Sequence, residues 1–147
     1  MIDKQYIGHT QPAFSVAVEA SRLRFFAKAT GQLDPVYSDE SAARDAGHPA
    51  LPVPPTFLFC LEMESPDPAA LRNLLGLDYR RLLHGEQRFV YHRMVYAGDQ
   101  LTFEQRIDDI YDKKGGALEF VVQDTDARNQ NGELCTTMRV VTVVRNA

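Results

Sequence analysis

Residues 56–64, TFLFCLEME, predict a buried helix, because apolar side chains recur there at helical spacing. Those side chains are Phe57, Leu58, Cys60 and Leu61. Thr56 is the predicted N-cap, since a threonine hydroxyl can accept a hydrogen bond from the first helical turn. Prolines at 49, 52, 54 and 55 make the chain before the helix stiff and extended. The helix is therefore an apolar element that other parts of the chain have to cover.

The second half of the chain changes period and predicts four long strands. They are rich in Val, Ile, Phe, Tyr and Thr, the residues that suit a pleated sheet, and Gly- or Asn-containing turns separate them. Consecutive strands joined by short loops predict an antiparallel meander, with FSVAV as an extra strand. The predicted strands are residues 85–96, 100–112, 117–128 and 133–144, with FSVAV at 14–18.

One apolar helix followed by a long antiparallel sheet indicates the α+β class, with the sheet wrapped around the helix. Shorter helices are expected elsewhere. The first runs from Glu19 and ends at Gly31 as C-cap, the second opens at residues 38–40, and the third covers 69–78.

Length and composition set limits on the function. The 147 residues are expected to form a single domain, residues 1–147, large enough for a proper core. A net charge of −4 without a Lys/Arg run argues against nucleic acid or an anionic membrane as partner. Short apolar runs, no signal-peptide pattern and two cysteines without CxxC spacing indicate a soluble cytoplasmic protein with reduced thiols. No metal-ligand spacing or Gly-rich phosphate loop is seen, so neither a metal nor a nucleotide cofactor is expected.

Four motifs indicate the fold and function more specifically. They are RFFAKATGQLDPVYSDESAA at 24–43, PVPPTF at 52–57, LLHGEQRFVYHRMVYAGDQLT at 82–102 and NGEL at 131–134. With the order of elements they resemble the hot-dog fold of the MaoC-like dehydratase family. The likeness runs from about Tyr6 to Arg145. Within this family, the chain is similar in particular to the N-terminal, non-catalytic half-type found in bacterial (3R)-hydroxyacyl-thioester dehydratases. This resemblance implies an acyl-CoA or acyl-carrier-protein thioester as ligand, and hot-dog dimers whose sheets join edge to edge.

The resemblance also identifies a changed active-site motif. Active members of the family carry Gly-Asp-x-Asn-Pro-aliphatic-His, whereas residues 31–37 here read GQLDPVY. The framework is kept at Gly31, Pro35 and Val36, with Ala43 at the small position. At the motif positions that carry the catalytic side chains, Gln32 replaces the aspartate, Asp34 replaces the asparagine and Tyr37 replaces the histidine.

These replacements remove the usual proton chemistry. Hydration of a 2-enoyl thioester needs a group of near-neutral pKa to hold and release a proton at the attacking water. Histidine supplies such a pKa, whereas an unshifted tyrosine has a pKa of about 10 and glutamine does not titrate. The family's His-Gly pair, whose glycine N–H binds the thioester oxyanion, corresponds here to Pro54-Pro55. Proline has no N–H to donate.

Other readings of these residues stay open. Asp34 is a candidate base if burial raises its pKa, but an Asp-Pro pair more often begins a turn and bonds local backbone, which we favour. Tyr37 is expected as a buried ring with its hydroxyl hydrogen-bonded. His84 and Glu86, two apart on a strand, would face one side and could hydrogen-bond. We favour His84 as a strand-end residue packed at a subunit interface.

Three functions are therefore carried forward. The first is an accessory subunit of an (R)-specific enoyl-thioester hydratase or 3-hydroxyacyl-thioester dehydratase, paired with a catalytic hot-dog partner. The second is a self-sufficient homodimeric hydratase or thioesterase that uses Asp34, Glu86 or His84. The third is a non-enzymatic acyl-thioester binding protein. The residues expected to contact the thioester by resemblance are Gln32, Asp34, Tyr37, Pro55, Thr56 and His84.

Overall fold

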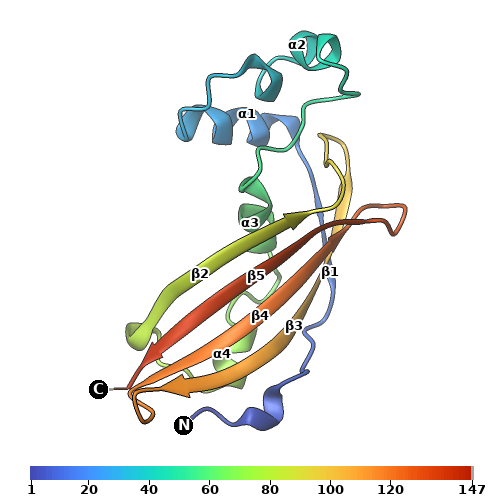
Figure 1. Ribbon diagram of the computed structural model, residues 1–147. Helices are drawn as coiled ribbons and strands as arrows, with labels where there is room; N and C mark the ends of the chain where they lie inside the picture. Colours follow the sequence, from blue (N-terminus) through green and yellow to red (C-terminus); the bar gives the residue numbers. More distant parts are fainter. Residues whose placement is uncertain (147) are drawn as a thin grey trace.

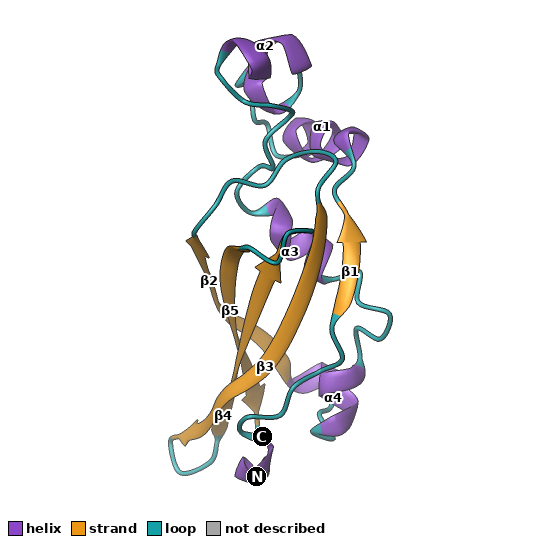
Figure 2. Cartoon of the chain, turned by 90° about the vertical axis from the view of Figure 1, so that its right-hand side faces the viewer, coloured by secondary structure: helices purple, strands orange, loops and turns teal. Residues whose placement is uncertain are grey.

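The computed structural model describes residues 1–146 and contains a five-stranded antiparallel sheet with helix α3 (Phe57–Glu62) against one face (Figures 1 and 2). This is the α+β hot-dog arrangement expected from the sequence. The strands are β1 (Phe14–Ala17), β2 (Leu82–Tyr91), β3 (Gln100–Lys113), β4 (Leu118–Arg128) and β5 (Leu134–Arg145).

The order of the strands differs from a simple meander. It is β1-β3-β4-β5-β2, so β3, β4 and β5 follow one another as predicted, but β2 pairs with β5 instead of β3. The edge of β3 is taken by β1. The expected strand 85–96 also ends early, because the chain after Tyr91 leaves the sheet. There it pairs with the segment before α3, through Val53 N–H to the Val95 carbonyl (2.9 Å) and Ala97 N–H to the Leu51 carbonyl (2.9 Å).

Helix α3 fills the space that the curved sheet encloses. Leu58 and Leu61 are buried on the helix, and Phe103 and Met138 are buried on the sheet face that it covers. Thr56 occupies the N-cap position as predicted, but its side chain makes no capping hydrogen bond. The stiff proline segment instead positions this end, where Phe57 N–H donates to the Pro54 carbonyl at 2.9 Å.

The remaining helices lie at the two ends of the sheet. Helices α1 (Ala20–Ala29) and α2 (Glu40–Asp45) sit beyond the end where β2 finishes, and α4 (Ala70–Leu74) lies on the same side of the sheet as α3 (Figures 1 and 2). Gly31 follows α1 with φ +71°, a left-handed conformation that favours glycine after a helix. The C-cap of α1 is Thr30, one residue before the predicted Gly31, and α2 begins at Glu40 after the N-cap Asp39, within the predicted start at residues 38–40.

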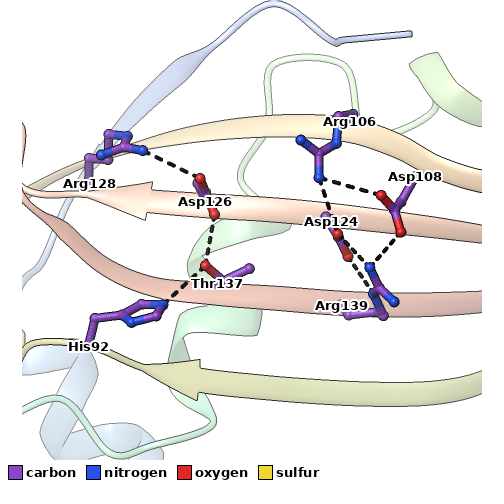
Figure 3. A network of polar contacts seen from close by, with 8 residues as sticks. All are labelled: His92, Arg106, Asp108, Asp124, Asp126, Arg128, Thr137 and Arg139. Atoms are coloured by element: carbon purple, nitrogen blue, oxygen red, sulfur yellow. Dashed lines mark hydrogen bonds and ion pairs between the residues drawn. The ribbon is translucent and has the colours of Figure 1, made fainter. Parts of the chain in front are cut away.

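The sheet face away from α3 carries a ladder of alternating charges (Figure 3). Arg139 bonds both carboxylate oxygens of Asp124, at 2.6 and 2.7 Å, and reaches Asp108 at 2.6 Å. Arg106 contacts the same two acids. The Arg139 hydrogen bond is the main cause that lowers the pKa of Asp124, against a smaller opposing effect of burial. The charges on this face are thus paired across neighbouring strands.

Candidate functional site

A cavity of about 250 Å³ lies at the N-terminal end of α3. The short 3-10 helix Pro35–Tyr37, the segment that leads into α3 and its first turn, the chain at and after the end of β2, and strand β5 meet there. Its walls are largely apolar. The lining residues are Tyr37, Val53, Pro55, Leu58, Tyr91, Arg93, Met94, Val95 and Thr136.

A hydrogen bond ties the edge strand to the helix entrance. The Tyr91 hydroxyl donates to the Pro55 carbonyl at 2.8 Å. Burial raises the pKa of Tyr91, so this phenol stays protonated at neutral pH. The bond closes one wall of the cavity from the β2 side.

The changed motif contributes one residue to this cavity. Tyr37 is half-buried, rather than buried as expected, and its side chain lines the wall. Asp34 is exposed, and its carboxylate accepts a hydrogen bond from Val36 N–H at 3.0 Å, the local turn that we favoured. Gln32 is exposed as well and accepts from Asp34 N–H at 3.1 Å. The structure therefore brings Tyr37 and Pro55 together, but leaves Gln32 and Asp34 outside the lining.

The proline pair stands at the helix entrance, as the motif comparison expected. Pro54 is buried, while Pro55 is exposed and borders the cavity. Because neither residue has a backbone N–H, this position offers no hydrogen bond to an oxyanion. Thr56 follows Pro55 and is exposed, and it does not belong to the cavity lining.

The proposed pairing of His84 with Glu86 is wrong. A β-bulge interrupts β2 between these residues, so the regular alternation of side chains is lost there. Glu86 forms an ion pair with Arg88 at 2.8 Å, while the exposed His84 ring packs edge-on against Phe59 with centroids 5.8 Å apart. His84 also precedes Tyr91 by seven residues on β2, or about 20 Å at the usual rise per residue, so it is remote from the cavity.

Sequence reasoning missed most of the polar groups around this cavity. Tyr91 and Thr136 come from β2 and β5, two strands whose pairing was not foreseen, and Arg93 follows the end of β2. The Thr136 hydroxyl is buried without a hydrogen-bond partner in the protein. The sequence did carry a signal for Tyr91, because this residue lies two positions after Phe89, which packs against the core, and residues two apart on a strand share a sheet face.

The chemistry available at the cavity is that of hydroxyls and one cation. Within the part of the chain that the structure describes, its lining includes no histidine, aspartate or glutamate. Arg93 is the charged group, and it is held by Glu133 at 3.0 Å. Such walls can position a ligand, yet they hold no group that titrates near neutral pH.

Residues 1–146 offer neither a cluster of metal ligands nor a helix that could cross a membrane. No three His, Cys, Asp or Glu side chains in this range lie close enough together to hold a metal ion. None of the helices in the same range is long and apolar enough to cross a membrane.

The sequence of this chain is similar to a protein-family model and to bacterial proteins. Residues 5–138 match the model of the family described as FAS1-like, dehydratase domain region. A UPF0336 protein of Streptomyces griseus subsp. griseus is 36% identical over 149 residues, which cover 99% of this chain and 97% of the relative. A UPF0336 protein of Thermobifida fusca is 33% identical and covers 98% and 94%.

Solved structures place the fold among dehydratases. The C-terminally truncated HadBC complex of Mycobacterium tuberculosis, a 3R-hydroxyacyl-ACP dehydratase, matches with a TM-score of 0.79 and 27% identity, over 93% of this chain and 96% of that one. A MaoC-like dehydratase gives 0.85 at 23%, over 97% of this chain and 43% of the other. The R-hydratase PhaJ1 of Pseudomonas aeruginosa gives 0.69 at 17%, over 96% and 83%. The last two matches show the fold alone. The chain belongs to the FAS1-like dehydratase domain region family and has the hot-dog fold of the MaoC-like dehydratases.

Proposed function

We propose that this protein is the accessory, thioester-binding half of an (R)-specific enoyl-thioester hydratase or 3-hydroxyacyl-thioester dehydratase. One observation supports the proposal: among the described residues, the cavity at the helix entrance is lined by Tyr37 and Pro55 but by no histidine, aspartate or glutamate. Tyr37 stands at the histidine position, and Pro55 borders the place where a backbone N–H would be needed. A site of this kind binds without supplying acid–base catalysis.

The cavity suits the reactive end of an acyl thioester. Its mainly apolar walls fit an acyl group, while the hydroxyls of Tyr37 and the unpartnered Thr136 can donate a hydrogen bond to a thioester carbonyl. Arg93 lies on the exposed side and can pair with a phosphate of CoA or of a carrier-protein prosthetic group. CoA and carrier protein share this thioester chemistry, so both belong in the test.

The free edge of β2 supports a hot-dog partner. An open strand edge presents unpaired backbone groups, which proteins generally cover. Leu83, Val90 and Tyr91 on β2, with Met94 just beyond it, are exposed apolar side chains. Tyr91 and Met94 also line the cavity, so a subunit docked on β2 would cover its open side. HadBC, to which this chain is 27% identical in sequence, is itself a complex of different subunits.

Co-purification tests the partnership. The tagged chain is captured from its native host, and the co-purifying proteins are identified by mass spectrometry. We expect a second hot-dog protein with an intact Gly-Asp-x-Asn-Pro-aliphatic-His motif. Leu83→Arg with Val90→Arg should abolish its capture. Phe25→Arg, which changes an exposed apolar residue on α1, is the matched control and should retain it.

The reconstituted pair is then assayed for hydration of crotonyl-CoA, a medium-chain enoyl-CoA and the matching carrier-protein thioesters. Activity that needs both subunits supports the accessory role. Capture of no hot-dog partner, together with thioester binding by a stable homodimer that has no activity, would favour a non-enzymatic binding protein instead.

A further inference from the structure

A second cavity, of about 200 Å³, lies at the other end of α3. It is bordered by the last turn of α3, by the segment that runs through Ser65 and Pro68 into α4, and by the sheet face beneath them. Phe59, Met63 and Leu71 supply apolar walls. None of its lining residues is shared with the cavity at the helix entrance.

The unusual group in this second cavity is Glu62, the last residue of α3. It is only 5% exposed, although glutamate is seldom buried to this extent without a partner. Its Oε1 accepts three hydrogen bonds, from Thr125 at 2.5 Å, Gln105 at 2.9 Å and Gln123 at 3.4 Å. Its Oε2 is equally buried and has no partner in the protein. One carboxylate oxygen is thus fixed by three donors, while the other remains available for a further donor.

The sheet beneath Glu62 also carries buried polar side chains. Gln123 on β4 lies opposite Val140 on β5, which lies opposite Gln87 on β2, so these three residues form one row across the sheet. The amide oxygen and nitrogen of Gln87 are both buried without partners. An apolar core does not need such a row, because each unsatisfied buried polar group destabilises the fold. Gln123 and Val140 line the cavity with Glu62, and Gln87 ends the row outside the lining, so buried polar groups gather on this part of the sheet.

The charge of the cavity selects the ligand. Glu62 and Asp67 are acidic, and no lysine or arginine lines the cavity within the described residues 1–146. We propose that this cavity is a second ligand site, for a small amphiphile whose apolar body ends in a hydrogen-bond donor, an ammonium or a hydroxyl group, that bonds Glu62 Oε2. A carboxylate-ended ligand is excluded, because it would bring a second negative charge next to Glu62 without a cation to neutralise it. This site is independent of the thioester site proposed above.

Methionine methyl NMR separates the two cavities. Met63 lines the second cavity and Met94 lines the cavity at the helix entrance. The full chain is labelled with 13C at the methionine methyl groups, and the signals are assigned by Met→Leu substitution. The probes are n-hexylammonium, 1-hexanol and hexanoate, which share a six-carbon body and differ in the end group. We expect hexylammonium and hexanol to shift the Met63 signal in a saturable way without shifting Met94, and hexanoate to leave both unchanged.

Substitutions assign the interaction to Glu62. Glu62→Gln keeps the shape and an acceptor oxygen but removes the charge, and we expect it to weaken hexylammonium binding by about tenfold or more. Glu64→Gln makes the same change two residues along, on a half-exposed glutamate that pairs with Arg22 and does not line the cavity. It should leave binding unchanged. Circular dichroism and thermal unfolding establish that both variants fold.

Three results would overturn the proposed second site. Saturable binding of hexanoate as tight as that of hexylammonium, hexylammonium binding unaffected by Glu62→Gln, or no Met63 shift with any probe would each contradict it. A Met94 shift on addition of crotonyl-CoA reports on the thioester site separately, so either proposal can fail without the other.

Discussion

The hydroxyl of Tyr91, at the end of edge strand β2, donates a 2.8 Å hydrogen bond to the carbonyl of Pro55, at the entrance of helix α3. The bond connects residues that are 36 positions apart in the sequence. It joins the sheet edge that is free for a partner to the turn that borders the candidate thioester cavity. A subunit docked on β2 would therefore touch a residue that also shapes the cavity wall.

Tyr91→Phe should lower the free energy of unfolding by about 1 kcal/mol, because it removes one hydrogen bond and keeps the ring. Urea unfolding followed by circular dichroism measures the change. Tyr79→Phe is the control, since that ring is exposed and lies under Arg72, and it should change the stability by much less. Equal effects of the two substitutions would show that the bond to Pro55 does not stabilise the fold in solution.

Gly85→Ala should destabilise the protein at the β2 bulge. An added Cβ would lie 2.7 Å from a methyl group of Val143 and 3.0 Å from the backbone carbonyl of Val141. Valine is stiff at χ1 and the carbonyl is fixed in the sheet, so overpacking of this kind costs about 1–3 kcal/mol. Urea unfolding of Gly85→Ala is compared with that of Glu86→Ala, which removes only an exposed ion pair with Arg88. A Gly85→Ala protein as stable as the parent would contradict the close approach of β2 and β5.

Asp124→Asn should destabilise the protein at neutral pH and remove part of its sensitivity to acid. The pKa of Asp124 is lowered in the folded state, chiefly by the hydrogen bond from Arg139. The carboxylate therefore stabilises the fold above its unfolded pKa of about 3.9, and this stabilisation is lost as the pH falls through the lower folded value. We expect a difference of about 1–3 kcal/mol at pH 7 that shrinks below about pH 4.

Unfolding free energies measured from pH 7 to pH 2.5 test this dependence, with Asp45→Asn as an exposed control. A difference between parent and Asp124→Asn that stays constant over the whole range would show that the ion pair with Arg139 does not act in solution.

The helices and strands could largely be predicted from the sequence, but the strand order could not. β-branched and aromatic residues mark β3, β4 and β5, and Gly31 and Asp39 mark helix ends, because these signals are local. The pairing of β2 with β5 depends on where the chain goes after Tyr91. Its hydrogen bonds to residues 51–53 are long-range contacts that leave no periodic signal.

The candidate site was predictable to the same limited extent. The motif at residues 31–37 identified Tyr37, and the proline pair identified Pro55, since both lie in short continuous segments. Arg93 and Thr136 reach the cavity only through the β2–β5 pairing, and the burial of Glu62 against β3 and β4 depends on the curvature of the sheet. Neither feature is encoded in local sequence spacing.

Restoring the family motif should give limited activity. Tyr37→His places an imidazole in the cavity, and Gln32→Asp adds the missing carboxylate in the turn beside it. We expect the double variant to gain a slow hydration of crotonyl-CoA that depends on a group titrating near pH 6.5. Adding Pro55→Gly should raise the rate further by about tenfold or more, since the loss of one oxyanion donor typically costs about 100–1,000-fold. If Pro55→Gly gives no increase in the double variant, the N–H at this position is not the missing donor.

The most direct test is the hydration of crotonyl-CoA by the purified chain without a partner. We predict turnover near the uncatalysed background, together with saturable binding of the thioester detected at the Met94 methyl signal. A turnover of about 1 s⁻¹ or more, within the usual range for enzymes, that survives Tyr37→Phe and falls with Asp34→Asn or His84→Ala would contradict the accessory role. It would show that the chain is a hydratase in its own right.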